Sequence, residues 1–338
     1  MSKISLFVLL LGAVLCLGIA SAPTNNERLP KANKLIQPPF LKLGDTVAIV
    51  APSGILKHRE AEIQRAVNLL ESWGLHALVG QHVFKQGNHF AGTDAQRCED
   101  FQNAMDNPNV KAIWAARGGY GTVRILDKLD YTKFHENPKW LIGYSDITAL
   151  HNDFHNAGYE TIHAMMCTNL TANTAGMDHT IASLKKALFG NLETYTLKGS
   201  NYNKPGSVQA PIVGGNLTIL HTMLGSKSSL DTRGKILFIE EIGEYKYHID
   251  RMLQSLKRAG YFDDCAGLLV GDMSKIRKNT TSWGSSVEQL ILDALAEYQF
   301  PIAFNMPAGH EADNRALILG QEVRMEVGTD FSTLQFLK

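Results

Sequence analysis

The chain has 338 residues, of which 44% are hydrophobic, enough for one large or two ordinary domains with buried cores. Its 33 Lys and Arg residues balance its 33 Asp and Glu residues. Because there is no net charge to attract nucleic acid or an anionic membrane over long range, we expect no nucleic-acid partner, and a partner that is recognised locally.

The first 22 residues are expected to be a cleaved secretory signal peptide. Lys3 precedes the apolar run 6–19, and small residues follow at 20–22. The run is shorter than the roughly 20 residues that a membrane-spanning helix needs, which favours a signal over a permanent anchor. The sequence therefore predicts a secreted or periplasmic protein without stable membrane insertion, with a polar leader over 23–40.

Strands and helices alternate through residues 41–175, the expected N-terminal domain. The apolar run 46–51 stops at Pro52, which predicts a buried strand and a turn. Residues 58–73 carry apolar side chains at helical spacing and end at Gly74, which predicts an amphipathic helix with a C-cap glycine. The further predicted elements are strands at 75–79, 110–116 and 140–143 and helices at 93–105, 122–129 and 147–156. This alternation predicts a parallel sheet with helices on both faces.

Apolar periodicity fades over 176–210, where the turn-rich stretch 201–207 lies, so this range is expected to connect two domains. Residues 211–338 would then form a smaller C-terminal α/β domain. Its predicted elements are strands at 236–239, 267–270 and 302–305, helices at 248–258 and 287–298, and a final β segment at 316–327. The predicted fold class is α/β in two units.

Ser145 follows an apolar strand and opens a helix, within Gly143-Tyr144-Ser145-Asp146. A serine on such a tight turn exposes its hydroxyl at the carboxyl edge of a sheet, where ligands bind. The segment does not complete the G-x-S-x-G pattern of α/β-hydrolases, and Ser145 could equally be the N-cap of the following helix. The spacing alone leaves both interpretations open.

Glycines are concentrated in Arg117-Gly118-Gly119-Tyr120-Gly121, at the end of another predicted strand. Backbone N–H groups in such a loop can approach a ligand closely and serve as oxyanion donors. The loop could instead hold a phosphate or be a simple turn, although the Lys-Ser/Thr of a P-loop and the G-x-G-x-x-G spacing are absent.

Two more strand ends carry ionisable side chains. Glu240 and Glu241 directly follow the apolar run 236–239, and His310 follows the strand expected at 302–305. A carboxylate so placed can orient a histidine, and a histidine titrates near neutral pH, although a pair of solvated acids is the alternative. Together the four loops supply a nucleophile, a donor, a carboxylate and a base, which indicates a site in the cleft between two domains.

Six short motifs in this order resemble those of the LD-carboxypeptidase family, also called muramoyltetrapeptide carboxypeptidases. They are Arg117-Gly118-Gly119-Tyr120-Gly121, Gly143-Tyr144-Ser145-Asp146, Gly214-Gly215-Asn216-Leu217, Phe238-Ile239-Glu240-Glu241, Arg251-Met252-Leu253 and Gly309-His310-Glu311. The resemblance implies a Rossmann-like N-terminal domain, similar to class I glutamine amidotransferases, and a smaller C-terminal α/β domain.

The resemblance also implies a serine peptidase whose triad falls on Ser145, Glu240 and His310, with Glu240 rather than Glu241 as the carboxylate. Such enzymes remove the terminal D-Ala from a murein tetrapeptide, L-Ala-D-Glu-diamino acid-D-Ala, or from a muropeptide, in peptidoglycan turnover or recycling. They need no metal and no other cofactor.

Further site residues follow from the expected acyl-transfer mechanism. Backbone N–H groups of Gly119 and Asp146 would form the oxyanion hole. Arg117, Gly118 and Tyr144 are expected to contact the substrate, with the Arg117 guanidinium binding a substrate carboxylate. Arg117 could instead be a structural ion-pair partner.

Two other functions remain open. The microcin C immunity peptidases are a sibling group that hydrolyses peptidyl or aminoacyl nucleotides with the same triad, although an export signal fits poorly with a cytosolic antibiotic. A non-catalytic murein-fragment-binding protein would keep the cleft without the chemistry. The sequence does not decide whether the chain forms a homodimer.

Overall fold

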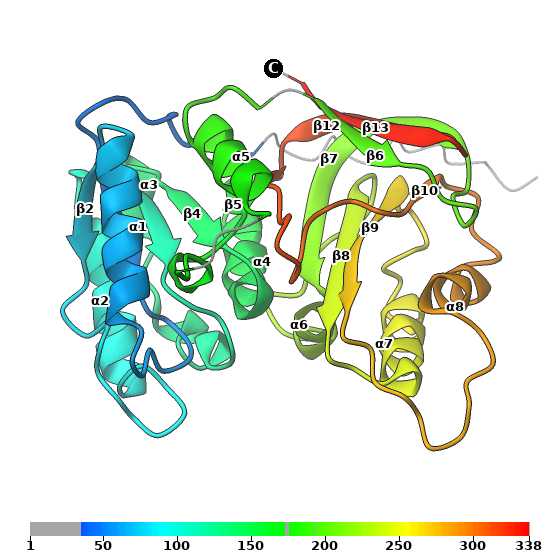
Figure 1. The fold of residues 1–338 in the computed structure, drawn as a ribbon, viewed down its shortest axis with the longest axis horizontal. Coiled ribbons are helices and arrows are strands. Elements are labelled where there is room, and N and C mark those ends of the chain that lie inside the picture. Colours follow the sequence, from blue (N-terminus) through cyan, green and yellow to red (C-terminus); the bar gives the residue numbers. More distant parts are fainter. Residues whose placement is uncertain (1–34, 173–175, 193, 338) are drawn as a thin grey trace, which may run out of the picture. The chain divides into compact units, whose positions relative to one another are not determined.

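The computed structural model describes residues 35–172, 176–192 and 194–337 (Figure 1). The expected signal peptide at 1–22 and most of the expected leader lie outside the described residues. Within the described part of the chain, no helix is long and apolar enough to cross a membrane.

A six-stranded sheet forms the N-terminal lobe, in the order β11-β5-β4-β3-β1-β2. Its strands are β1 (Thr46–Val50), β2 (His76–Val79), β3 (Val110–Ala115), β4 (Trp140–Gly143), β5 (Thr161–His163) and β11 (Leu317–Leu319). The first five strands are parallel, which confirms the predicted parallel layer, whereas β11 pairs antiparallel with β5.

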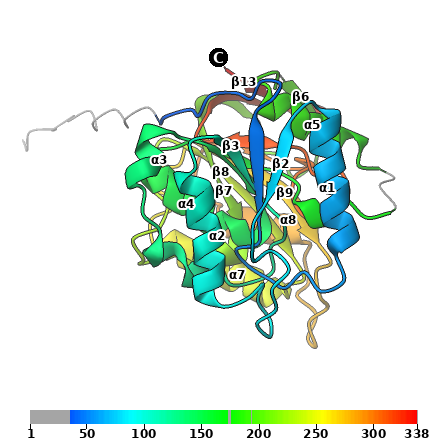
Figure 2. The same ribbon diagram turned by 90° about the vertical axis from the view of Figure 1, so that its left-hand side faces the viewer.

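Helices cover both faces of this sheet, as Figure 2 shows. They are α1 (Glu60–Ser72), α2 (Asp94–Asp106), α3 (Thr132–Glu136), α4 (Thr148–Asn156) and α5 (Asp178–Leu188). Successive side chains of β1 point to opposite faces: Val47 and Ile49 pack in one core with α1 and α5, and Ala48 and Val50 pack in another with α2, α3 and α4. Because both faces are buried, the strand is apolar throughout.

A seven-stranded sheet forms the C-terminal lobe, in the order β10-β9-β8-β7-β12-β13-β6. Its strands are β6 (Thr194–Lys198), β7 (Gly206–Asn216), β8 (Ile236–Ile242), β9 (Gly267–Ser274), β10 (Ile302–Ala303), β12 (Glu322–Val327) and β13 (Phe331–Phe336). Strands β7 to β10 are parallel and the other three are antiparallel. Helices α6 (Leu217–Thr222), α7 (Lys246–Arg258) and α8 (Val287–Ala294) pack on one face.

The opposite face of the second sheet shares a core with the first sheet. Ile212, Ile236 and Phe238 belong to the same buried cluster as Trp140 of β4 and Ile162 of β5, and all five are 0% exposed. The two lobes are therefore held together by packed apolar side chains as well as by the connecting chain.

Three segments differ in structure from their prediction. The range 176–210, expected as a connection, contains α5, β6 and the start of β7. The helix expected at 122–129 is two short 3₁₀ helices. The segment expected at 316–327 divides at Gly320, where φ is 95°, into β11 and β12, which belong to different sheets.

Two C-terminal elements are shorter than predicted. The helix expected over 287–298 ends at Ala294. The strand expected over 302–305 contains only Ile302–Ala303, because the next amide, that of Phe304, donates to the side chain of Asn203 at 2.9 Å instead of to a neighbouring strand. The chain leaves the sheet at this point and turns towards the first lobe.

Phe238→Ala is expected to lower the free energy of unfolding by about 3–5 kcal/mol, because it leaves a cavity in the core between the two sheets. Phe331 is 59% exposed on β13, so Phe331→Ala is the matched control and should change stability by about 0.5 kcal/mol or less. Urea unfolding followed by tryptophan fluorescence measures both, and equal losses would contradict a shared core.

Candidate active site

Ser145 lies on a sharp and strained turn. The strand β4 ends at Gly143, Tyr144 is extended, and Ser145 has φ 62°, a left-handed conformation that side chains other than glycine rarely adopt. Such a residue costs on the order of 1–3 kcal/mol and persists where the surrounding structure imposes it. No side-chain capping bond is formed at this helix start, so Ser145 is not the N-cap that its position also allowed.

The hydroxyl of Ser145 faces a histidine from the other end of the chain. Its Oγ is 3.1 Å from Nε2 of His310, and Nδ1 of His310 is 2.7 Å from Oε2 of Glu240. The Glu240 side chain is 0% exposed and the His310 side chain is 13% exposed. A proton on Nδ1 that is donated to Glu240 leaves Nε2 free to accept from Ser145. The three residues expected to form a triad are thus in contact.

The neighbouring acids on β8 have different partners. The sequence predicted both acids directly after the strand, whereas in the structure both lie within it. Successive residues of a strand point to opposite faces of the sheet. The Oε2 of Glu241 accepts from the backbone N–H and hydroxyl of Thr218, at 2.8 and 2.7 Å, so this carboxylate holds the first turn of α6. Neither acid is a solvated strand end, since both side chains are buried.

Three carboxylates affect the protonation of the histidine. Burial by itself lowers the pKa of His310, but the hydrogen bond and charge of Glu240, with the charges of Glu241 and Asp272, raise this pKa above its ordinary value. Burial in turn raises the pKa of Asp272 to about 6. Gly309 has φ 142°, and a Cβ there would lie 2.9 Å from Asp272 Cβ and 3.1 Å from Glu240 Oε2. Only glycine fits beside these two carboxylates, and the next residue, His310, can then place its imidazole between Glu240 and Ser145.

The glycine loop runs directly beside the serine. A Cβ at Gly118 would lie 3.3 Å from Ser145 Cβ and 3.4 Å from Ser145 Oγ, and Gly119 has φ 105°. The carbonyl of Gly118 also accepts from the N–H of Gly54, at 3.1 Å. The structure therefore places Gly118 beside Ser145, with Gly119 next along the loop, while Asp146 follows the serine in the chain.

The Asp146 side chain connects three loops, which the sequence did not predict. Its Oδ2 accepts from Ser53 Oγ at 2.6 Å, from Thr122 Oγ1 at 2.6 Å and from Thr122 N at 2.9 Å. All three side chains are almost wholly buried. The carboxylate thus fixes the serine turn to the glycine loop and to the turn after β1. The sequence offered little signal for this network, since Ser53 lies just beyond the strand predicted at 46–51 and Thr122 begins the helix predicted at 122–129.

Arg117 and Tyr144, both expected to contact substrate, have different surroundings. The guanidinium of Arg117 donates to the carbonyl of Ile55, and among the described residues it has no carboxylate partner. The structural ion pair is therefore not found. Tyr144 is 6% exposed and packs edge to face against His310, with ring centres 4.8 Å apart. Its hydroxyl accepts from Asn169 at 3.0 Å, so this ring supports the imidazole.

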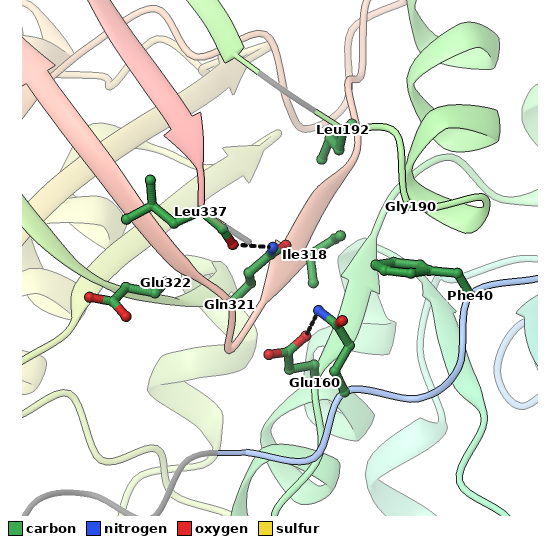
Figure 3. A pocket seen from close by; sticks show the side chains of 9 residues that line it. Phe40, Glu160, Gly190, Leu192, Ile318, Gln321, Glu322 and Leu337 are labelled. Atoms are coloured by element: carbon green, nitrogen blue, oxygen red, sulfur yellow. Dashed lines mark hydrogen bonds between the residues drawn. The ribbon is translucent and has the colours of Figure 1, made fainter.

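A hollow of about 330 Å³ lies elsewhere, where the chain segments around Phe40, Gly190, Gln321 and Leu337 meet (Figure 3). Phe40, one of the lining residues, stacks on Trp140, with ring centres 5.6 Å apart. None of its nine lining residues is a predicted site residue. This hollow is therefore separate from the serine, histidine and glutamate.

Asp146→Asn is expected to destabilise the protein by about 2–3 kcal/mol, because the amide oxygen can replace only Oδ2, which accepts the three donors, and the amide N–H₂ then replaces Oδ1, which is buried with no acceptor beside it. Asp127, which is 77% exposed and pairs with Lys227, provides the control Asp127→Asn, whose effect should be near zero. Urea unfolding compares the two, and equal effects would rule out a structural role for the buried carboxylate.

Comparisons with known proteins give the family. Residues 47–164 match the LD-carboxypeptidase N-terminal domain and residues 209–325 match the LD-carboxypeptidase C-terminal domain. The "Probable murein peptide carboxypeptidase" of Bacillus subtilis (strain 168) is 35% identical, over 88% of this chain and 94% of the relative.

Solved structures agree with this match. The crystal structure of muramoyltetrapeptide carboxypeptidase from Oxalobacter formigenes has a TM-score of 0.77 and 27% identity, over 87% of this chain and 99% of that chain. The Microcin C7 self immunity protein MccF shares the fold, with a TM-score of 0.78 and 23% identity over 90% of this chain and 98% of that chain. The predicted two-part α/β fold is thereby confirmed, and the chain belongs to the LD-carboxypeptidase family.

Proposed function

We propose that the chain is a serine carboxypeptidase that removes the terminal D-Ala from murein tetrapeptides. The observation that carries the proposal is the continuous contact from Ser145 Oγ through His310 to the buried Glu240. Membership of the LD-carboxypeptidase family and the names of its relatives support a murein peptide as the substrate.

In the proposed reaction, Nε2 of His310 takes the proton of the Ser145 hydroxyl as Oγ attacks the carbonyl carbon of the diamino acid. Glu240 holds the ring and stabilises the imidazolium. The tetrahedral oxyanion is stabilised by the N–H groups of Gly119 and Asp146, which flank the serine. When the C–N bond breaks, His310 returns the proton to the leaving D-Ala nitrogen. Water then attacks the acyl-enzyme with His310 as base, and Ser145 is restored.

A carboxypeptidase must also recognise the free C-terminal carboxylate of its substrate. Arg117 adjoins Gly118, where an added Cβ would contact the serine, and has no carboxylate partner among the described residues. Its guanidinium is thus available for a bidentate bond to a carboxylate. We assign the terminal carboxylate to this residue.

The apolar run at 6–19 supports action outside the cytoplasm, on murein or on its released fragments in peptidoglycan turnover or recycling. This segment lies outside the described residues. Secretion with removal of residues 1–22 is the expected processing.

Ser145→Ala is expected to lower kcat by about 10⁴-fold or more, and Glu240→Gln by about 10⁴-fold, because each removes one member of a unit that acts together. Release of D-Ala from L-Ala-D-Glu-diaminopimelate-D-Ala, followed by mass spectrometry, measures the reaction. Ser207→Ala, at an exposed serine of β7, is the control and should retain full activity.

Three other outcomes would contradict the proposal in different ways. Internal cleavage would exclude a carboxypeptidase. Equal tetrapeptide binding by wild type and Ser145→Ala, with turnover by neither, would indicate a murein-fragment-binding protein. Hydrolysis of an aminoacyl nucleotide in preference to the tetrapeptide would favour the alternative reaction of the microcin C immunity peptidases.

Activity is expected to fall as pH decreases through a pKa above 6.5, because His310 must be neutral to accept the Ser145 proton and its pKa is raised. Asp272→Asn removes one of the charges that raise this pKa, so the acid limb of kcat/KM should move to lower pH. Asp263→Asn, at an exposed position, should leave the profile in place. An unchanged profile in Asp272→Asn would show that Asp272 does not influence the base.

A further inference from the structure

A second cavity, of about 660 Å³, lies beside the carboxyl ends of β8 and β9. Lys246, the first residue of α7, lines one side, and residues 276–280 and 282–286 of the loop between β9 and α8 line the rest. The loop is tied at both ends. The N–H of Arg277 donates to the carbonyl of Glu244 at 2.9 Å, and Nζ of Lys246 donates to the carbonyl of Ser285. The cavity is therefore preformed.

The lining of this cavity carries uncompensated positive charge. Three of its eleven residues are cationic, Lys246, Arg277 and Lys278, and none is acidic. Within the described ranges neither Arg277 nor Lys278 has a carboxylate partner. Arg277 instead lies over the ring of Tyr245, 5.6 Å from its centre, which holds the guanidinium in place. The side chains of Arg277 and Lys278 are both exposed, so an anion that entered the cavity could reach two cations.

The cavity is connected to the triad through two short segments. Strand β8 carries Glu240 and leads through residues 243–245 to Lys246. Ser274 ends β9 immediately before the cavity loop, and its hydroxyl donates at 2.6 Å to Glu311, the neighbour of His310. The cavity and the triad therefore share one end of the second sheet, while Arg117 belongs to the first lobe.

We infer that this cavity binds the free α-carboxylate of the D-Glu residue of the stem peptide, with Arg277 and Lys278 as its ligands; the inference rests on the proposed function. The D-Glu residue precedes the diamino acid and is linked through its side-chain carboxyl, so its α-carboxylate is free. With the terminal carboxylate at Arg117 and this one at the cavity, one anion is held on each side of the scissile bond. The peptide is thereby bound in one direction.

The test compares two tetrapeptides that differ only in this group, one with D-Glu and one with D-isoglutamine, whose α-carboxylate is an amide. Wild type should prefer the D-Glu peptide by about 10- to 100-fold in kcat/KM, the size expected for charge-assisted hydrogen bonds. The double variant Arg277→Gln/Lys278→Gln should cleave both peptides at similar rates, close to that of wild type on the amide. Lys275→Gln removes a charge from the same loop outside the cavity lining and should keep the preference.

The inference is overturned if the double variant discriminates as strongly as wild type, or if wild type cleaves both peptides equally. If wild type releases no D-Ala from either peptide, the proposed function is wrong, and this result does not decide whether the cavity binds the D-Glu carboxylate. Calorimetric Kd values for both peptides on Ser145→Ala, with and without the double substitution, then still test the cavity. The inference is also overturned if Ser145→Ala binds the D-Glu and D-isoglutamine peptides with similar Kd values. It is overturned as well if the ratio of these two Kd values is the same with and without the double substitution.

Discussion

The contact between Ser145 and His310 depends on how the chain crosses between the two sheets. The histidine lies in the segment between β10, in the second sheet, and β11, which returns to the first sheet. There Leu317 pairs with His163, and His163 neighbours Gly143, at the end of the serine strand. The histidine segment is thus fixed at one end to the sheet that carries Glu240 and at the other to the sheet that carries Ser145. A shift between the lobes would separate the base from one of its two partners, and the shared apolar core resists such a shift.

Strain and tight packing at the serine follow from this arrangement. A left-handed serine is unfavourable, so other contacts must hold it. Asp146 supplies them by accepting donors from the two neighbouring loops, and Gly118 lets one of those loops touch the serine. The same contacts hold Gly118 and Asp146 in place beside Ser145, and a fixed arrangement of this kind is what the proposed oxyanion hole requires.

The sequence predicted the parts of the site that depend on local chain signals. Ser145, Gly118, Glu240 and His310 each lie at or near a strand end marked by an apolar run, and such ends meet at one edge of a parallel sheet. The role of β11 could not be predicted, because a three-residue strand carries no sign of which sheet it joins. The Asp146 network was missed for a similar reason, since hydrogen bonds between buried side chains depend on tertiary packing. Apolar periodicity also failed at β6, because an antiparallel strand with an exposed face has few apolar residues.

The distribution of charge limits how an anionic peptide can lie in the site. The charges of Glu240, Glu241 and Asp272 raise the pKa of His310, so a substrate carboxylate close to them would be repelled. Two cations that have no carboxylate partner among the described residues lie on other segments, Arg117 in the glycine loop of one lobe and Arg277 in the loop after β9 of the other. In the proposed binding mode, a peptide with carboxylates on both sides of its scissile bond would place them at these two cations and only the neutral amide at the acidic centre. The acids that raise the pKa of His310 would then also select the part of the substrate that can approach it.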